Sequence, residues 1–88
     1  MNEKDLERVL KALANKRRLA ILRVIKNEKE ITVANIASKI KLSFKATSKH
    51  LAILTSANIT EKDQRGLLVY NRLSGNLPTI VRATMSIL

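Results

Sequence analysis

The residues of this 88-residue chain that are best placed to do chemistry are cations. From Ile31 to Thr60 the sequence has no Asp or Glu, and four lysines fall in that interval: Lys39, Lys41, Lys45 and Lys49. An ammonium group binds phosphate as a point charge and can donate hydrogen bonds to the acceptors on a guanine edge. The interval therefore favours contact with a polyanion, although any one of these lysines taken alone is more commonly part of a solvated helix face.

Catalytic and metal chemistry find little support in the sequence. The chain has no cysteine, which excludes disulfides and thiolate ligands, and its one histidine is His50. A tight metal site needs three or four ligands. No Gly-rich phosphate loop is present, and no Ser–His–acid set has a suggestive spacing. We therefore expect no enzymatic activity, no cofactor and no metal.

The overall charge extends the preference for polyanions to the whole chain. Seventeen Lys and Arg against seven Asp and Glu give a net charge of +10, which favours nucleic acid or an anionic membrane surface. Only Phe44 and Tyr70 are aromatic, too few to stack single-stranded bases or to anchor a basic helix in a membrane surface. No apolar run approaches membrane-spanning length and the start of the chain is charged, so we expect no signal peptide and a cytoplasmic location.

The spacing of aliphatic residues predicts the elements that would position the cations. Stripes at helical spacing predict helices over about residues 3–14, 16–26, 33–40, 44–57 and 77–88. Asn15, Thr32 and Ser43 are expected to cap the second, third and fourth helices. Asn58, just beyond the fourth helix, is expected in the left-handed conformation. The cations at 16–18 oppose the dipole of the second helix, which indicates either a phosphate or an internal carboxylate as their partner.

A hairpin should follow the fourth helix. Residues 59–63 and 67–73 are predicted to form two strands around a turn that contains Gly66, with Leu67, Val69 and Tyr70 covering the core. The predicted fold is mainly α with a small β-hairpin (α+β), in the order four helices, hairpin, last helix. A short turn between the third and fourth helices completes the layout of a single winged helix-turn-helix domain over residues 1–88.

The fourth helix is the candidate recognition element. If Thr47, Leu51 and Leu54 face the core, the outer side carries Lys45 and Ser48 near the start of the helix. A helix presented in this way fits the major groove, where residues near its N-terminus reach base edges. Lys45 can donate to guanine O6 or N7, and Ser48 can donate or accept a hydrogen bond.

Neighbouring residues would position this helix on the DNA. Lys49 and His50 are expected to contact the DNA backbone, and Phe44 either touches a thymine methyl group or packs in the core. Arg65, near the hairpin tip, either reaches the backbone or a narrow minor groove or is a free turn arginine. The predicted DNA contacts are Ser43, Phe44, Lys45, Thr47, Ser48, Lys49, His50, Lys62 and Arg65.

Several spaced motifs, in order, resemble those of the ArsR-type winged helix-turn-helix repressors over nearly the whole chain. The matching runs are Leu10–Ala14 with Arg18-Leu19 and Ile21-Leu22, Leu42-Ser43 with Thr47–Leu51 and Leu54, Ala57–Ile59, and Gly66 with Val69-Tyr70 and Arg72-Leu73. The resemblance implies a homodimer that binds an inverted-repeat operator in double-stranded DNA and represses transcription. It places the dimer interface on the first and last helices, about residues 3–14 and 77–88, at Leu6, Leu10, Leu13, Leu77, Ile80, Val81, Thr84 and Leu88.

The chain departs from the metal-sensing members of that family. In those members the segment that corresponds to residues 30–36 carries cysteine ligands, but here it carries Thr32 and Ala34, and the last helix has no His, Asp or Glu. The resemblance therefore implies a regulator without a metal sensor site. Two alternatives stay open, namely a non-specific architectural DNA-binding protein and a winged-helix adaptor for protein partners.

Overall fold

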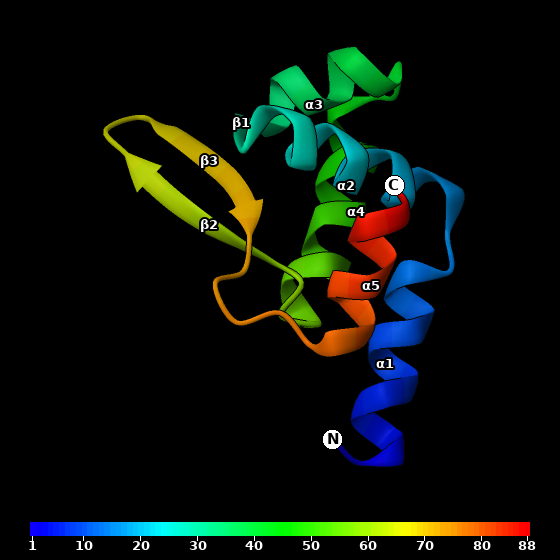
Figure 1. Ribbon diagram of the computed structural model, residues 1–88. Helices are drawn as coiled ribbons and strands as arrows, with labels where there is room; N and C mark the ends of the chain where they lie inside the picture. Colours follow the sequence, from blue (N-terminus) through cyan, green and yellow to red (C-terminus); the bar gives the residue numbers. More distant parts are fainter.

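The computed structural model describes residues 1–88 as helices packed together with a hairpin that projects from them (Figure 1). The elements in chain order are α1 (Glu3–Leu13), α2 (Lys16–Glu28), β1 (Glu30–Thr32), α3 (Val33–Ile40), α4 (Phe44–Ser56), β2 (Thr60–Arg65), β3 (Leu68–Leu73) and α5 (Thr79–Ile87). The predicted α+β class and the order of helices and hairpin are confirmed. None of the helices is long and apolar enough to cross a membrane.

The core is a single cluster of 14 buried residues to which all five helices contribute. Ile21, Leu22 and Ile25 of α2 are almost completely buried, and the apolar rows of α1, α4 and α5 close around them. Leu19 has the helical spacing of Leu22 and Ile25 but is only half-buried, and Ile21 lies in the core instead. All the large members are aliphatic, because the chain has almost no aromatic residues to bury.

The helix starts follow the predicted caps. The side-chain oxygen of Asn15 accepts from the amides of Arg17 and Arg18, that of Thr32 accepts from Asn35, and that of Ser43 accepts from Ala46. Each bond satisfies a donor that the first helical turn leaves without a partner. At the far end of α4, Asn58 has φ +59°, the left-handed conformation predicted for it.

Cations of α2 bind the C-terminal ends of three other helices. Arg18 donates through Nε to Ala12 O (2.6 Å) and through Nη2 to Lys11 O (2.9 Å) at the end of α1. Arg17 reaches Ile40 O at the end of α3 (3.4 Å), and Lys26 donates to Met85 O in the last turn of α5 (2.7 Å). Positive charge at these ends complements the helix dipoles, and the arginines satisfy carbonyl groups at the ends of α1 and α3. The partners of the two arginines are therefore backbone carbonyls, and the carboxylate that the sequence suggested is absent.

The sheet has three strands where the sequence indicated two. β1 pairs with β3, and β3 pairs with β2, all antiparallel, so that β3 is central. β1 has only three residues, too few to show an alternating pattern, and its last residue Thr32 was interpreted only as a helix cap. Buried Asn71 helps to hold β1 in place, since its Nδ2 donates to Ile31 O at 3.3 Å.

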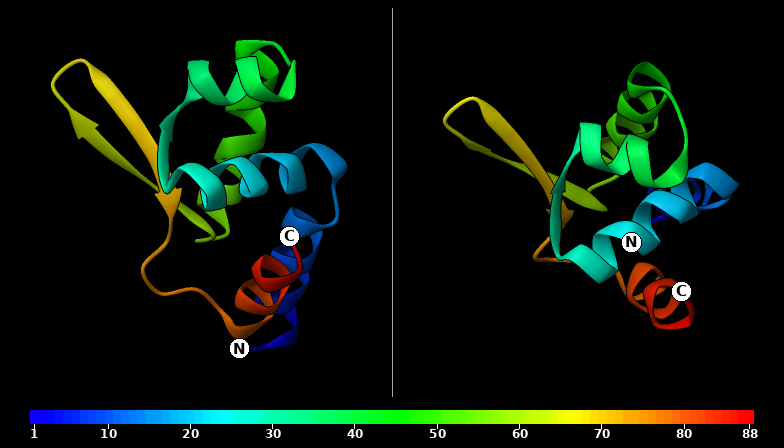
Figure 2. Two further views of the ribbon diagram at one scale, coloured as in Figure 1. Left: turned by 45° about the horizontal axis from the view of Figure 1, so that its top comes forward. Right: turned by 90° about the horizontal axis from the view of Figure 1, so that it is seen from above.

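The hairpin does not cover the core with the residues that the sequence indicated. Leu67 is fully exposed (102%) and Leu68 is half-exposed (52%), because the distal half of the hairpin stands clear of the helices (Figure 2). Val69 and Tyr70 are half-buried, and the sheet residue that seals the core is Ile31 of β1. The prediction for Leu67 is therefore wrong.

Candidate nucleic-acid interface

The turn between α3 and α4 consists of residues 41–43 and contains no glycine. Lys41 takes the left-handed conformation (φ +56°), which ends α3, and the amide of Leu42 bonds back to Ala37 O at 3.0 Å. Ser43 then caps α4. The short turn fixes the direction of α4 relative to α3, and both helix ends lie at the upper end of the molecule in Figure 1.

α4 divides into a buried side and an exposed side as its spacing predicted. Thr47, Leu51 and Leu54 are at most 1% exposed and face the core. Lys45 and Lys49 are exposed, and Ser48 between them is half-buried. The N-terminal half of α4 therefore presents two ammonium groups and a hydroxyl to solvent, a set of donors that suits phosphates and base edges.

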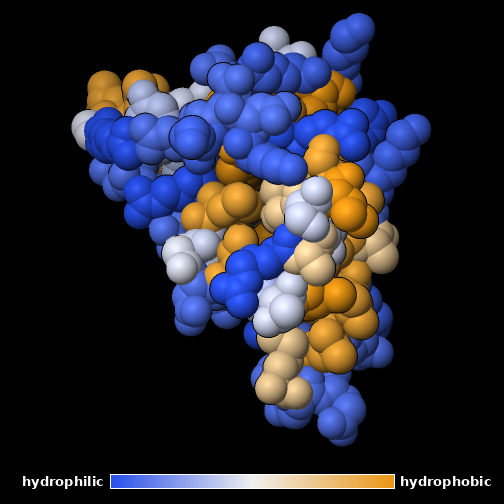
Figure 3. Space-filling model, in the orientation of Figure 1, coloured by the Kyte–Doolittle hydropathy of each residue, from blue (hydrophilic) through white to orange (hydrophobic).

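The lysines on and around this helix have no acidic partner. The ion pairs of the structure involve Lys11, Arg65 and Arg72 alone among the cations. The exposed and unpaired lysines of this region are Lys39, Lys41, Lys45 and Lys49. In Figure 3 the upper end of the molecule is accordingly almost all hydrophilic. Unpaired cations on one face provide the attraction that a phosphate backbone requires.

Two of the predicted contacts on α4, Thr47 and Phe44, differ in exposure. Thr47 is fully buried, and its Oγ1 donates to Ser43 O at 2.8 Å, so it has no surface with which to touch DNA. The prediction that Thr47 faces the core is confirmed, and the prediction that it contacts DNA is wrong. Phe44 is exposed (59%) at the start of the helix, which agrees with the predicted DNA contact and not with the alternative of a core residue.

His50 connects α4 with the N-terminus of α2. Its Nδ1 lies 3.3 Å from Nη1 of Arg18, so a neutral ring would accept there and carry its proton on Nε2. Partial burial lowers the pKa of His50, and the nearby charges of Arg18 and Arg17 lower it further. A neutral His50 can donate only one hydrogen bond outward, from Nε2, which makes it a weaker phosphate ligand than a charged imidazolium.

The hairpin arginine is bound within the protein. Arg65 donates to both oxygens of Glu30 (2.7 and 2.6 Å) and to Asp63 (2.9 Å), and its guanidinium lies 4.8 Å from the centre of the Tyr70 ring. The bidentate bond lowers the pKa of the Glu30 carboxyl and raises the pKa of Arg65. Arg65 is therefore not the free turn arginine of one of the two predictions, and its contact with DNA stays a prediction. Lys62 is exposed and forms no ion pair.

The expected dimer residues fall into two groups. Leu6 (38%), Leu10 (44%) and Ile80 (36%) are exposed large apolar side chains of α1 and α5. Leu13 and Val81 are buried in the core of the chain itself, so they cannot contact a partner, and those two predictions are wrong. The other three are half-buried: Leu77, Thr84 and Leu88. Ile87, which is 83% exposed, was missed although it lies beside the stripe. Figure 3 shows apolar surface over α5 and α1 at the lower right.

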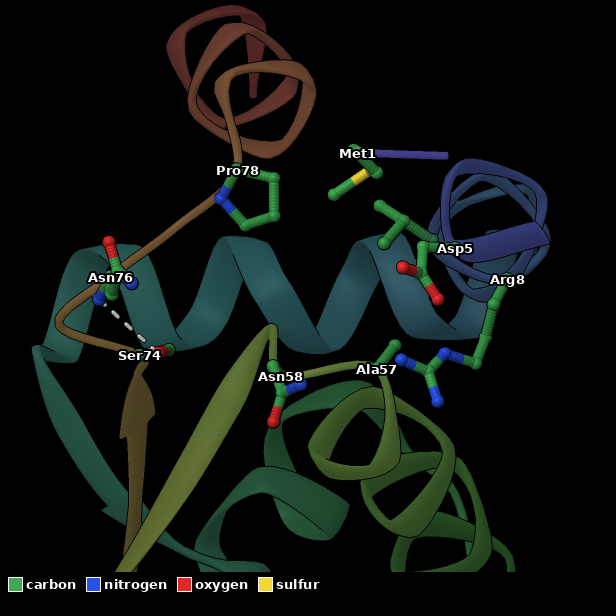
Figure 4. Close-up of a pocket in the computed structure, with 9 residues that line it drawn as sticks. Met1, Asp5, Arg8, Ala57, Asn58, Ser74, Asn76 and Pro78 are labelled. Carbon is green, nitrogen blue, oxygen red and sulfur yellow. Dashed lines mark hydrogen bonds between the residues drawn. The ribbon is translucent and has the colours of Figure 1, made fainter. Parts of the chain in front are cut away.

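A hollow of about 370 Å³ lies between the start of α1, the end of α4 and the loop before α5 (Figure 4). Asp5 and Arg8 border it on one side, and Ser74 and Asn76 on the other, where the amide of Asn76 donates to Ser74 Oγ at 3.3 Å. It contains neither a nucleophile with an adjacent base nor a pair of carboxylates, so the arrangement offers no catalytic chemistry. No group of three or more His, Cys, Asp or Glu side chains in the chain is placed to hold a metal ion.

Comparison with known proteins agrees with this geometry. The family model described as "Bacterial regulatory protein, arsR family" matches residues 15–62. The transcriptional activator HlyU of Vibrio cholerae is 35% identical over 80 residues, which cover 91% of this chain and 70% of that protein. A homolog of the cadmium resistance transcriptional regulatory protein CadC from Staphylococcus aureus is 35% identical over 72 residues, 82% of this chain. The match spans only 60% of that relative's length.

Solved structures give the same result. Reduced HlyU from Vibrio cholerae superposes with a TM-score of 0.83 at 33% identity, covering 99% of this chain and 87% of that one. A homodimeric winged helix-turn-helix DNA-binding domain from Mycobacterium bovis superposes with a TM-score of 0.83 at 31% identity, covering 96% and 75%. Because the family model matches more than half of the chain and the elements agree from α1 to α5, the chain belongs to the arsR family of bacterial regulatory proteins.

Proposed function

We propose that this chain is a homodimeric, sequence-specific DNA-binding protein that represses transcription without a metal sensor site. The observation that carries the proposal is the N-terminal half of α4, which is held by its buried side and exposes Lys45, Ser48 and Lys49 with no carboxylate nearby. The relatives are named as transcriptional regulators, and none of those cited is named as an enzyme. A bacterial protein with this function acts in the cytoplasm, where the chromosome lies.

In this proposal the residues of α4 have separate roles. Lys45 and Ser48, within the first two turns, reach base edges in the major groove and read the sequence. Lys49 and Lys62 bind phosphates, which orients the protein and supplies salt-dependent affinity. Ser43 keeps its side chain on the amide of Ala46 and contributes to binding by fixing the start of α4.

The dimer would form through the exposed apolar residues of α1 and α5. Leu6, Leu10 and Ile80 have no apolar partner within the chain that covers them, and burying them against a second copy would remove apolar surface from water. Two copies related by a twofold axis would present two α4 helices to two half-sites one helical turn apart. The Mycobacterium bovis relative, described as homodimeric, supports this arrangement.

A metal signal is not part of the proposal. The CadC homolog is named for cadmium resistance, and cadmium is a soft metal that thiolates bind well. This chain has no cysteine to supply such a ligand. Repression is the direction we propose because a dimer seated on an operator blocks access to the promoter. The HlyU relative, in contrast, is named as an activator. If the output of a reporter gene rises when this protein is expressed, the protein activates transcription and the proposed repression is wrong.

The proposal is tested by selection from a random-sequence duplex library, followed by sedimentation. Recovery of an inverted repeat whose half-sites lie about 10–11 base pairs apart, centre to centre, would support a symmetric dimer. Enrichment of no sequence would contradict sequence-specific binding and favour a coating protein. Leu10→Asp should convert the dimer to a monomer at micromolar concentration, while Ala52→Asp, on exposed α4 surface, should keep the dimer and weaken DNA binding. A monomeric wild-type protein would refute the dimer.

A further inference from the structure

The tip of the hairpin is apolar and has no structural use within the chain. Gly66 (φ +62°) and Leu67 form the turn between the paired residues Arg65 and Leu68, and the positive φ suits the first position of a type II′ turn. Leu67 is exposed over its whole surface and Leu68 over half of its own. Two adjacent exposed leucines at the end of a projecting hairpin add nothing to the stability of the core.

The apolar surface continues from the tip to the start of α4. A hollow of about 270 Å³ separates the hairpin tip from the first residues of α3 and α4, and its lining is almost entirely apolar. Phe44, 59% exposed, forms the α4 side of this hollow, one residue before Lys45. In Figure 3 the tip stands out as an apolar patch at the upper left, surrounded by hydrophilic surface. The hollow, which is lined by residues of both the tip and α4, places the tip beside the face that we propose to lie on DNA.

Both arginines of the hairpin are neutralised by carboxylates of the sheet. Arg65 is held by Glu30 and Asp63, and Arg72 donates to Glu61 at 2.8 Å. Lys62 is the one exposed hairpin cation without a carboxylate partner, and it lies several residues before the turn. The tip therefore offers DNA two leucine side chains in place of a free guanidinium. Apolar side chains bind DNA in the minor groove by entering between base steps, which they partly unstack.

We propose that the hairpin enters the minor groove beside the site of α4 and inserts Leu67 as an apolar wedge at a base step. This inference rests on the proposed function and adds a specificity mechanism to it. A wedge favours steps that unstack easily, namely TA and CA/TG, so the hairpin would read the deformability of the sequence flanking each half-site. It would also bend the duplex away from the inserted side chain.

The test uses the duplex that wild-type protein enriches from the random library, labelled at both ends so that energy transfer reports the bend. Leu67→Ser should reduce the bend and weaken binding roughly 10- to 100-fold, the range expected for loss of one buried leucine contact. Leu67→Lys should recover affinity at low salt, because an ammonium attracts phosphate, but should not recover the bend. The matched control is Gln64→Ala, an exposed residue of the same hairpin, which should change neither quantity.

The outcomes separate the wedge from the proposed function. If wild-type protein binds its enriched duplex specifically and Leu67→Ser leaves affinity and bend unchanged, the wedge is refuted and the regulator remains. If Leu67→Ser instead lowers the sedimenting mass and leaves DNA binding intact, the tip joins copies of the chain, which also refutes the wedge. If wild-type protein enriches no sequence, the proposed function fails and the wedge fails with it. Replacing the flexible flanking steps by an A-tract should weaken DNA binding by the wild-type protein but not by Leu67→Ser.

Discussion

Arg18 is the side chain whose loss should most disturb the arrangement of the helices. It joins three elements, because it extends from the first turn of α2, bonds two carbonyls at the end of α1 and contacts His50 of α4. The substitution Arg18→Met removes the guanidinium and keeps most of the aliphatic stem, so that loss of packing contributes little. Arg17→Met is the matched control, since it removes the same charge from the neighbouring residue, whose one bond is 3.4 Å long and exposed.

The size of the effect follows from the bonds. A hydrogen bond to a charged group contributes about 1.5–3 kcal/mol, and Arg18 makes two short ones to carbonyls. The site is only half-buried, so water replaces part of what is lost and the lower end of that range applies. We expect Arg18→Met to lower the free energy of unfolding by about 2–3 kcal/mol, or Tm by roughly 10–20 °C for a domain of this size. Arg17→Met should lower the free energy of unfolding by no more than about 0.5 kcal/mol.

The assay is urea unfolding followed by circular dichroism at one fixed protein concentration, because dimerisation would make stability depend on concentration. An NMR titration gives a second readout, in which the pKa of His50 should rise in Arg18→Met as one of the positive charges that lower it is removed. Equal losses of stability in the two variants, with no change in the pKa of His50, would show that the contacts of Arg18 do not hold α1 to α2 and α4.

Three further predictions concern the DNA face, the histidine and the hairpin. Lys45→Ala should weaken binding to the selected duplex by about 1–3 kcal/mol and to a scrambled duplex by much less, whereas Lys39→Ala should weaken both equally, as measured by anisotropy. The pKa of His50 is lower in the folded protein than its ordinary value of 6.5 in the unfolded chain. The free energy of unfolding should therefore fall as the pH drops from 6.5 through the folded pKa, because the unfolded chain binds the proton more readily in that range. Urea unfolding of His50→Gln should show a smaller fall. Glu30→Gln should free Arg65 from β1 and leave Asp63 as its one carboxylate partner. Hydrogen exchange should then show a less protected hairpin, and non-specific DNA binding should fall more steeply with salt.

The helices and the recognition face could be predicted because they depend on short-range pattern. The caps Asn15, Thr32 and Ser43 act within three residues of themselves, and the row Thr47, Leu51 and Leu54 repeats at helical spacing. A residue on the opposite side of such a row must be exposed. Spacing also places Lys45 and Lys49 outward, whatever the rest of the chain does.

The rest depends on distant partners that spacing does not reveal. Glu30 and Arg65 are 35 residues apart, and they meet only because β1 and β2 both pair with β3. The spacing of apolar residues along a helix also does not distinguish residues buried in the core of the chain from residues buried in a dimer interface. For this reason Val81, which is fully buried in the core, is wrongly predicted at the interface. Leu67 was placed in the core because its type suggests burial, although its position beside Gly66 puts it at the hairpin turn.

The central claim, that the exposed side of α4 reads a DNA sequence, is tested most directly by fluorescence anisotropy across a salt series. The probes are the library-selected duplex and a scrambled duplex of the same composition. We predict binding to the selected duplex on the order of 10³-fold tighter, with the preference kept as salt weakens both complexes. Equal affinity for the two duplexes, falling steeply with salt, would contradict the claim and would indicate a non-specific architectural protein that binds the phosphate backbone.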